Sequence, residues 1–147
     1  MSGMSTNKKI SIFLVDDDEL YLKLLIAGLS YNKSYQVKTF LTGELCLAQL
    51  DEKPDIIVLD YFLNGIEKTA LDGLQTLTNI KSLHPEIFVI MLSSQDKIEV
   101  AVNCMKMQAS EYIVKSETAF TRLDMAIQTM MHYKTMEKTL NWYMEKL

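Results

Sequence analysis

Three consecutive aspartates, Asp16, Asp17 and Asp18, follow a short apolar segment, and a fourth aspartate, Asp60, ends another one. Carboxylate oxygens bind hard divalent cations, and a carboxylate can also act as a nucleophile. Clustered carboxylates repel one another, which raises their pKa values unless a cation lies among them. Asp18 and Glu19 also suit a helix N-terminus, where acids are favoured. On its own, Asp60 is equally consistent with a turn cap and with a reactive group.

Hydroxyl groups and a lysine follow two further apolar segments. Ser93 and Ser94 come directly after residues 86–92, and Lys115 comes directly after residues 111–114. A lone serine or lysine in such a place is usually only solvated. The joint occurrence of acid, acid, hydroxyl and cation at four segment ends, in this order, indicates a single site.

The apolar segments are predicted to be strands that position these side chains. Residues 56–59 read Ile-Ile-Val-Leu without polar alternation, which is typical of a parallel strand covered by helices on both faces. Residues 10–15 have the same character, whereas residues 35–40 alternate and are predicted to be an edge strand. Because ligands bind at the carboxyl ends of strands in open α/β sheets, the site is expected at that edge.

Amphipathic segments between the strands predict helices over residues 19–30, from Thr42 to about residue 50, and over residues 74–84 and 96–108, with a last helix from Thr118. Five β-α units in succession predict an α/β fold, a doubly wound five-stranded parallel sheet with five helices. The predicted buried residues are Leu22, Leu25, Ile26 and Leu29; Leu45 and Leu47 with Cys46 or Leu50; Leu74, Leu77 and Ile80; Ile98, Ala101, Val102 and Met105; and Phe120, Leu123, Ile127 and Met130.

Composition limits the alternatives. A chain of 147 residues with 48% apolar and 23% charged residues is long enough for one ordinary domain with a core. A net charge of −4 without a dense Lys/Arg block argues against direct nucleic-acid binding. No apolar run approaches the ~18 residues of a membrane span, and the amino terminus has no signal-peptide pattern. Cys46 and Cys104 lack a CxxC or histidine partner and are predicted to be buried thiols of a cytoplasmic protein.

Over about residues 8–131 the chain resembles the CheY-like receiver domains of two-component response regulators, which have a flavodoxin-like fold. The segments that carry this resemblance are Phe13-Leu14-Val15-Asp16-Asp17, Ile56-Ile57-Val58-Leu59-Asp60, Val89-Ile90-Met91-Leu92-Ser93-Ser94 and Tyr112-Ile113-Val114-Lys115. The resemblance implies a signalling domain that accepts a phosphoryl group from another protein.

The resemblance also implies roles for the acids. Asp60 is then the phosphoacceptor. Asp17 and Asp60 bind Mg²⁺ directly, together with the backbone carbonyl of Phe62, and Asp16 acts mainly through water. A carboxylate is a weak nucleophile, so such a site depends on neutralising the charge of the incoming phosphoryl group.

The remaining roles concern phosphoryl binding and signalling. By resemblance, Ser93 and Lys115 bind the phosphoryl oxygens, and Ser93 and Tyr112 form a switch that alters the surface of the fourth helix, fifth strand and fifth helix. The implied donor is a sensor histidine kinase or a phosphotransfer protein. The implied activity is self-catalysed phosphotransfer followed by autodephosphorylation.

Two segments depart from the family pattern. Leu63-Asn64 replaces a Met-Pro pair and Gly73 comes late, so residues 64–72 are interpreted as an insertion that alters partner docking or phosphoryl lifetime, or that is a neutral surface feature. Ser116 replaces a proline that in the family follows the lysine through a cis bond. Without proline, we expect either a trans bond that aims Lys115 differently or a strained cis bond.

The carboxyl-terminal segment extends beyond what a receiver needs. We therefore divide the chain into a receiver domain, residues 8–133, and a helical extension, residues 134–147. Near the seam positions of a heptad pattern, which Glu137 interrupts, fall Leu123, Met130, Tyr133, Leu140, Met144 and Leu147. We predict one long helix that is stabilised by self-association as a homodimer or by a downstream output domain, since an isolated helix is marginal in water.

Two rival functions remain. The run Asp16-Asp17-Asp18 also resembles the DxD of haloacid-dehalogenase-like phosphohydrolases, with Asp16 as nucleophile and Asp18 as general acid. That assignment leaves Asp60 without a role, and no acidic pair follows Lys115 at a strand end. The other rival is a receiver-like module that binds partners without phosphorylation, which is disfavoured because every charged site residue is present.

Overall fold

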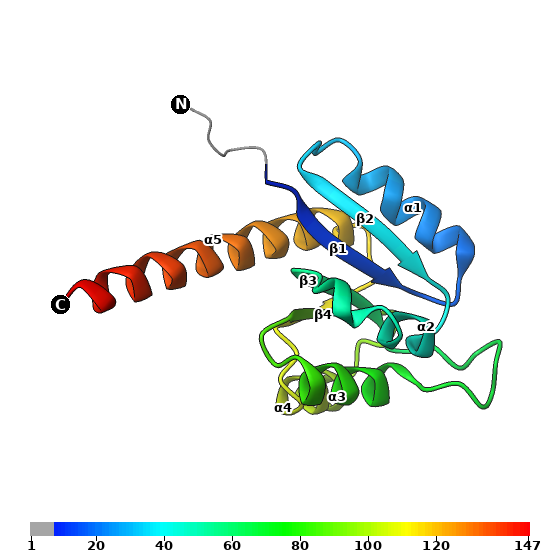
Figure 1. Ribbon diagram of the computed structural model, residues 1–147. Helices are drawn as coiled ribbons and strands as arrows, with labels where there is room; N and C mark the ends of the chain where they lie inside the picture. Colours follow the sequence, from blue (N-terminus) through cyan, green and yellow to red (C-terminus); the bar gives the residue numbers. More distant parts are fainter. Residues whose placement is uncertain (1–7) are drawn as a thin grey trace.

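A five-stranded parallel sheet forms the centre of the computed structural model, which describes residues 8–147 (Figure 1). The strands are β1 (Ile10–Val15), β2 (Tyr35–Phe40), β3 (Ile56–Asp60), β4 (Phe88–Ser93) and β5 (Glu111–Val114). Their order in the sheet is β2-β1-β3-β4-β5, and every neighbouring pair is parallel. The predicted α/β fold is therefore confirmed, with β2 at one edge.

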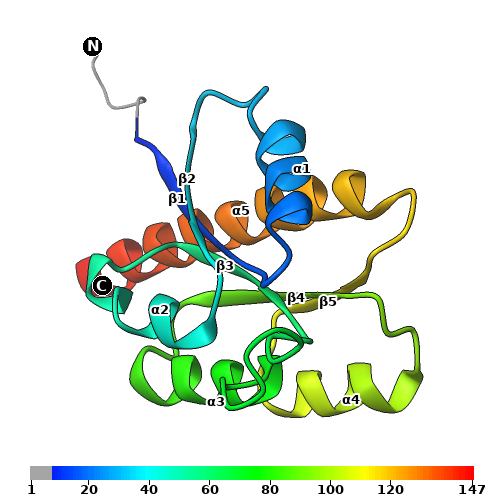
Figure 2. The same ribbon diagram turned by 90° about the vertical axis from the view of Figure 1, so that its right-hand side faces the viewer.

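Helices cover both faces of the sheet (Figure 2). They are α1 (Glu19–Leu29), α2 (Gly43–Leu47), α3 (Gly73–Leu83), α4 (Ile98–Lys106) and α5 (Ala119–Lys146), with a short 3₁₀ helix, η1 (Leu50–Glu52). Helices α1 and α5 enclose one apolar core against the sheet, and α2, α3 and α4 enclose the other. This three-layer arrangement is what a doubly wound sheet requires.

The side chains of β1 show why the central strands lack polar alternation. Ile12 and Leu14 point into the core under α1 and α5, whereas Phe13 and Val15 point into the opposite core. All four are almost completely buried. Each such burial contributes about 1.5–3 kcal/mol, so the carboxyl end of β1 is held firmly in the sheet.

Capping side chains begin the first two helices where the sequence predicts them. The carboxylate of Asp18 accepts hydrogen bonds from the backbone N–H groups of Leu20 and Tyr21. The hydroxyl of Thr42 accepts one from the backbone N–H of Leu45. Such caps satisfy N–H groups that have no partner inside the helix.

In α1 and α2, two residues predicted to be buried are exposed instead. Helix α2 ends at Leu47, earlier than predicted, and Leu45 is 53% exposed. The chain then turns through η1, which brings Leu50 into the core beside Cys46. Ile26 is also exposed, because α1 meets the sheet through a narrower stripe than its sequence suggests.

Helix α4 presents a different face to the sheet from the predicted one. Ile98 is 81% exposed, and Val102 and Met105 also face solvent, so the predicted buried stripe is wrong. Cys104 is the buried residue of the helix, and Val100 packs partly against the same core. The helix carries two apolar faces, and the packing at the edge of the sheet buries the smaller one.

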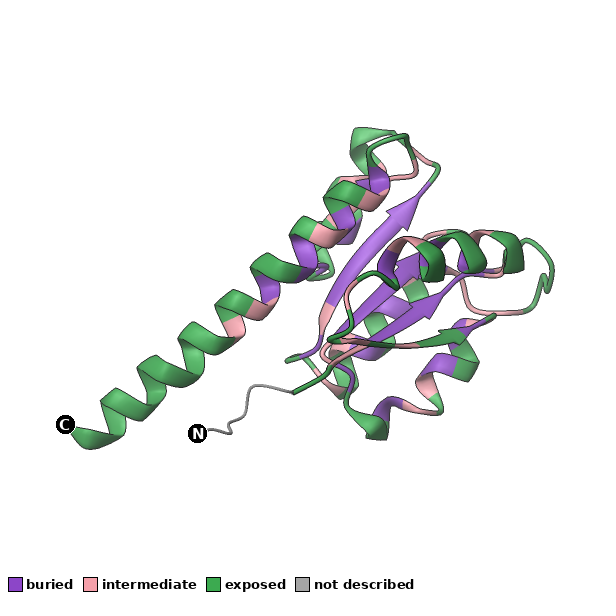
Figure 3. Cartoon of the chain, turned by 90° about the horizontal axis from the view of Figure 1, so that it is seen from above, coloured by how far each residue is buried: buried purple, intermediate pink, exposed green. Residues whose placement is uncertain are grey.

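Helix α5 continues past the sheet as a single helix (Figures 1 and 3). It runs for 28 residues, and residues 135–147 are all exposed. Within residues 8–147, no helix is both long enough and apolar enough to cross a membrane. The division into a receiver domain, 8–133, and an extension, 134–147, stays a prediction.

Candidate functional site

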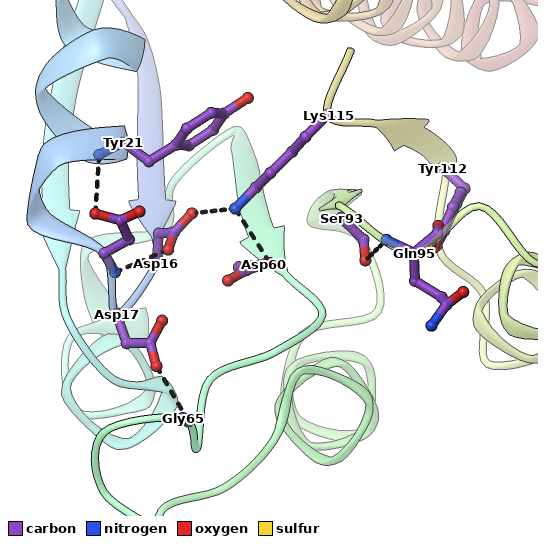
Figure 4. A network of polar contacts seen from close by, with 10 residues as sticks. Asp16, Asp17, Tyr21, Asp60, Gly65, Ser93, Gln95, Tyr112 and Lys115 are labelled. Atoms are coloured by element: carbon purple, nitrogen blue, oxygen red, sulfur yellow. Dashed lines mark hydrogen bonds and ion pairs between the residues drawn. The ribbon is translucent and has the colours of Figure 1, made fainter.

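The predicted site residues converge at the carboxyl edge of the sheet (Figure 4). Asp16 directly follows β1, Asp60 is the last residue of β3, Ser93 is the last residue of β4, and Lys115 directly follows β5. Asp16, Asp60 and Ser93 are buried, with exposed fractions of 2%, 5% and 0%. The strand order explains this convergence, because β3 lies between β1 and β4.

The acids form one cluster. Asp16, Asp17 and Asp60 each offer a carboxylate oxygen, and these oxygens all lie within 4.8 Å of one another. Such an all-oxygen donor set at the edge of a buried site suits a hard divalent cation. Burial, followed by the neighbouring charge of Asp16, raises the pKa of Asp60 to about 7.

Lys115 supplies part of the missing charge. Its Nζ lies 2.9 Å from Asp16 Oδ2 and 3.5 Å from Asp60 Oδ1. Burial alone would lower the pKa of Lys115, but Asp60 and Asp16 outweigh that effect and raise it overall. Lys115 thus contacts two of the three clustered carboxylates, and the cluster holds more carboxylates than lysines, which suits a bound cation.

The loop between β3 and α3 returns to the site. The backbone N–H of Gly65 donates to Asp17 Oδ2 at 3.2 Å, and the side chain of Leu63 is fully buried. The loop therefore contacts the acidic cluster directly, although the interpretation of residues 64–72 as an insertion stays a prediction. Burial and Asp16 raise the pKa of the Asp60 carboxylate by more than the backbone of Phe62 beside it lowers that pKa.

Gly73 allows α3 to begin very close to the reactive strand end. A Cβ at this position would lie 2.3 Å from the carbonyl oxygen of Asp60 and 2.5 Å from the Cα of Tyr61. Both are backbone atoms, so no change of side-chain rotamer can relieve the clash. Asp72 and Gln75 close a capping box around this helix start. The glycine thus shapes the backbone that carries Asp60.

The two predicted switch residues meet at Gln95. The backbone N–H of Gln95 donates to Ser93 Oγ at 3.0 Å, and the hydroxyl of Tyr112 donates to the backbone carbonyl of Gln95 at 2.5 Å. Tyr112 is therefore held against the loop between β4 and α4. A change at Ser93 has a direct route to Tyr112 through one backbone residue.

Lys115 faces Asp60 although no proline follows it. The Lys115–Ser116 bond is trans. Of the two expectations, the cis bond is not found and the bond is trans, yet Lys115 still reaches Asp60 Oδ1 at 3.5 Å, so proline is dispensable for this aim. The Nζ atom lies 4.1 Å from the centre of the Tyr21 ring as well as close to the two buried acids. Contacts around the side chain therefore aim it.

Comparison with known proteins identifies the family. Residues 12–128 match the response regulator receiver domain. The chain belongs to this family. One curated relative of this receiver is the nitrogen assimilation regulatory protein NtrX of Azorhizobium caulinodans, which is 37% identical over 103 residues. The match covers 69% of this chain but 22% of the relative, so the receiver spans about a fifth of that protein's length.

Solved structures agree with this assignment. The receiver domain of NtrX from Brucella abortus is 30% identical and superposes with a TM-score of 0.72, covering 82% of this chain and 98% of that one. The BeF3-activated receiver domain of DrrB, a protein of Thermotoga maritima, is also 30% identical, with a TM-score of 0.67 and the same coverages. Both likenesses extend over nearly the whole of the other receiver.

Sequence reasoning did not find four residues that shape the site of this receiver. Gly65 and Gln95 act through backbone atoms, so their side-chain identity carries no signal. Gly73 was noticed only for its late position. Tyr21 carried a weak signal, since it is an aromatic residue one turn into the helix that follows the acids.

Proposed function

We propose that this receiver accepts a phosphoryl group on Asp60. The observation that carries the proposal is the convergence of a buried Asp60 carboxylate with Lys115, 3.5 Å away, and with the acids of the cluster. The DrrB receiver, which is 30% identical, has been solved as a BeF3-activated form, and BeF3 has the shape and charge of a phosphoryl group. Lys115 contacts both Asp60, the last residue of β3, and Asp16 of the same acidic cluster.

The proposed reaction transfers a phosphoryl group from a histidine of the donor protein to Asp60. A carboxylate oxygen of Asp60 attacks phosphorus, the P–N bond to the donor histidine breaks, and an acyl phosphate forms. The imidazole nitrogen keeps the bonding electrons as the leaving group. Lys115 neutralises charge on the phosphoryl oxygens as they approach. The partner is a sensor histidine kinase or phosphotransfer protein, and we place the reaction in the cytoplasm, where ATP is available to such a kinase.

The acidic cluster is proposed to hold Mg²⁺. Asp17 and Asp60 would bind it directly, the backbone carbonyl of Phe62 would complete the protein ligands, and Asp16 would act through water. The bound cation supplies charge neutralisation on the phosphoryl oxygens. The fit rests on three carboxylates with oxygens within 4.8 Å of one another and on the raised pKa of Asp60.

The output is proposed to be a change of the surface formed by α4, β5 and α5. A phosphoryl dianion on Asp60 would draw the hydroxyl of Ser93 away from Gln95, and Tyr112 is bonded to that same residue. A cavity of about 500 Å³ lies beside Tyr112, and exposed apolar residues of α4 line it. These residues are Ile98, Val102 and Met105.

The phosphohydrolase rival fits the geometry less well. It needs Asp18 as a general acid, yet the Asp18 carboxylate accepts hydrogen bonds from the N-terminal N–H groups of α1. Asp16 is already paired with Lys115 at 2.9 Å. The rival also gives no role to Asp60, which lies in the same cluster.

Acetyl phosphate and Mg²⁺, followed by intact-mass measurement, test the proposal. The wild type should gain the mass of one phosphoryl group, with acetate as the leaving group. Asp60→Asn should fold and gain none, whereas Asp17→Asn should be labelled slowly and bind Mg²⁺ more weakly. The phosphohydrolase rival predicts instead that Asp16→Asn abolishes labelling and that Asp60→Asn is labelled on Asp16. A wild type without any label would support the phosphorylation-independent module.

A further inference from the structure

The orientation of Lys115 has to come from contacts of its side chain. Lysine has a flexible four-carbon stem, and many rotamers are open to it after a short strand. Ser116 and the two residues after it are exposed, and the backbone N–H of Lys115 donates to the carbonyl of Ser93 at 2.7 Å, which holds the backbone but not the side-chain rotamer. In the structure, the ammonium group lies between the carboxylates of Asp16 and Asp60 on one side and the ring of Tyr21 on another (Figure 4).

The Tyr21 ring is itself held in place from two elements. Its backbone N–H donates to the capping carboxylate of Asp18 at 3.3 Å, in the first turn of α1. Its ring stacks on Phe120 of α5, with centroids 6.2 Å apart and an interplanar angle of 28°. The ring of Tyr21 is therefore supported both by its own helix and by α5.

The contact between ring and ammonium is of the cation–π type. The Nζ atom lies 4.1 Å from the ring centre, well inside the roughly 6 Å over which such attraction operates. Lys115 is 18% exposed at its side chain, so water screens the attraction only in part. The hydroxyl of Tyr21 makes no hydrogen bond within residues 8–147, which leaves the ring face as the interacting part.

We propose that Tyr21 is a positioning residue, which holds the ammonium group of Lys115 toward Asp60 and thereby speeds phosphoryl uptake. This inference rests on the proposed function of Asp60. Tyr21 does not touch the transferred group in this role. It acts through Lys115, by limiting the directions in which the lysine stem can turn before the donor arrives.

A spectroscopic test does not depend on phosphotransfer. Protons on the ε-carbon of a lysine packed over an aromatic face are shifted upfield by the ring current. We expect this NMR shift for Lys115 in the wild type and in Tyr21→Phe, and its loss in Tyr21→Leu. Ordinary random-coil shifts for Lys115 in the wild type would overturn the proposal whatever Asp60 does.

A kinetic test separates positioning from a structural role. With acetyl phosphate and Mg²⁺, Tyr21→Leu should be labelled about twofold to thirtyfold more slowly, the factor expected from loss of a cation–π contact. Tyr21→Phe should stay within about twofold of the wild type. Tyr31→Leu is the matched control, because the Tyr31 hydroxyl links the turn after α1 to Asp124 of α5 and not to Lys115; its rate should be unchanged.

A double-mutant cycle decides whether Tyr21 acts through the lysine. In a Lys115→Ala background, adding Tyr21→Leu should cause no further slowing, because the partner of the ring is gone. The same slowing in both backgrounds, or none in either, would overturn the proposal while leaving Asp60 as the acceptor. A wild type that takes up no phosphoryl group would instead contradict the proposed function, and the NMR shift would still report on the ring contact.

Discussion

At the scale of single residues, the reactive edge depends on how closely neighbouring backbones approach. Gly73 lies where a Cβ would meet the carbonyl oxygen of Asp60 at 2.3 Å. Gly28, the penultimate residue of α1, has only ordinary contacts, at 3.5 Å from the ring of Phe120. The two glycines therefore provide a matched pair for testing which close approach matters.

Gly73→Ala should lower the free energy of unfolding by about 1–3 kcal/mol, because the new methyl group forces the backbone after β3 to move. Labelling of Asp60 by acetyl phosphate should slow in the same variant. Gly28→Ala should instead gain about 0.5–1 kcal/mol from helix propensity. Urea denaturation measures both changes, and equal stabilities for the two variants would contradict this account of Gly73.

The buried thiol of Cys46 leads to a prediction about pH. Burial raises its pKa from the usual 9.0 to about 12. Because the folded-state pKa is raised, the stability from this neutral thiol is fully present below about pH 9 and is lost as pH rises toward 12. Native protein at pH 8 should react slowly with a disulfide reagent, and urea-unfolded protein should react quickly.

The variant Cys46→Ala isolates this contribution. It should be less stable than the wild type at pH 7, since a buried side chain is shortened. The difference between the two proteins should shrink as the pH is raised from about 9 to about 11. A difference that stays constant over that range would show that Cys46 does not contribute to the alkaline loss of stability.

At the scale of elements, the two helices of the proposed output surface are anchored very differently. Helix α5 buries Leu123, Ile127 and Met130 against the sheet, whereas α4 buries Cys104. The far end of α5 carries exposed apolar residues that recur every seven positions, Tyr133, Leu140 and Leu147, with Met136 and Tyr143 three positions after the first two. A heptad of this kind is typical of helices that associate.

We expect the exposed end of α5 to pair with a second copy of the chain. Leu140→Glu should then reduce the mass measured by light scattering, because it places a charge in the seam. Asn141→Glu, one position away and outside the seam, should leave the mass unchanged. A wild type that is monomeric at every concentration tested would contradict self-association and favour another occupant of this surface.

At the scale of the whole molecule, the free energy of local opening should differ between elements. The central strands β1 and β3 are buried on both faces, while α4 makes few buried contacts and lies beside a cavity of about 500 Å³. Regions with few buried apolar contacts open most easily. The loop from Ser93 to α4 is also tied to the reactive edge through Gln95.

Amide hydrogen exchange should follow that ranking. In the free protein, α4 should exchange faster than β1 and β3. Adding BeF3 with Mg²⁺ should change the exchange rate of amides in α4 and in the loop before it. The exchange rate in the edge strand β2 should stay the same. The Asp60→Asn variant is the control. If its α4 amides change their exchange rate by the same amount, the effect on α4 does not depend on Asp60.

The sequence alone determined the layers of this protein and the edge where its site lies. Runs such as Ile56 to Leu59 are apolar on both faces, because alternate side chains must enter two cores, and this pattern is local. The shared position of the acids, Ser93 and Lys115 could be predicted because each lies at or just after the end of one of these strands. The helix caps Asp18 and Thr42 were also predictable, since capping depends on the next three residues.

Tertiary structure decided the features that depend on distances between separate elements. Which face of α4 is buried could not be predicted, because both of its faces are apolar and only packing against the sheet edge chooses between them. The aim of Lys115 could not be predicted from its next residue, because Ser116 bears only on the backbone. The ring of Tyr21 and the carboxylates of Asp16 and Asp60 come from other elements, and only the packed fold brings them around the lysine.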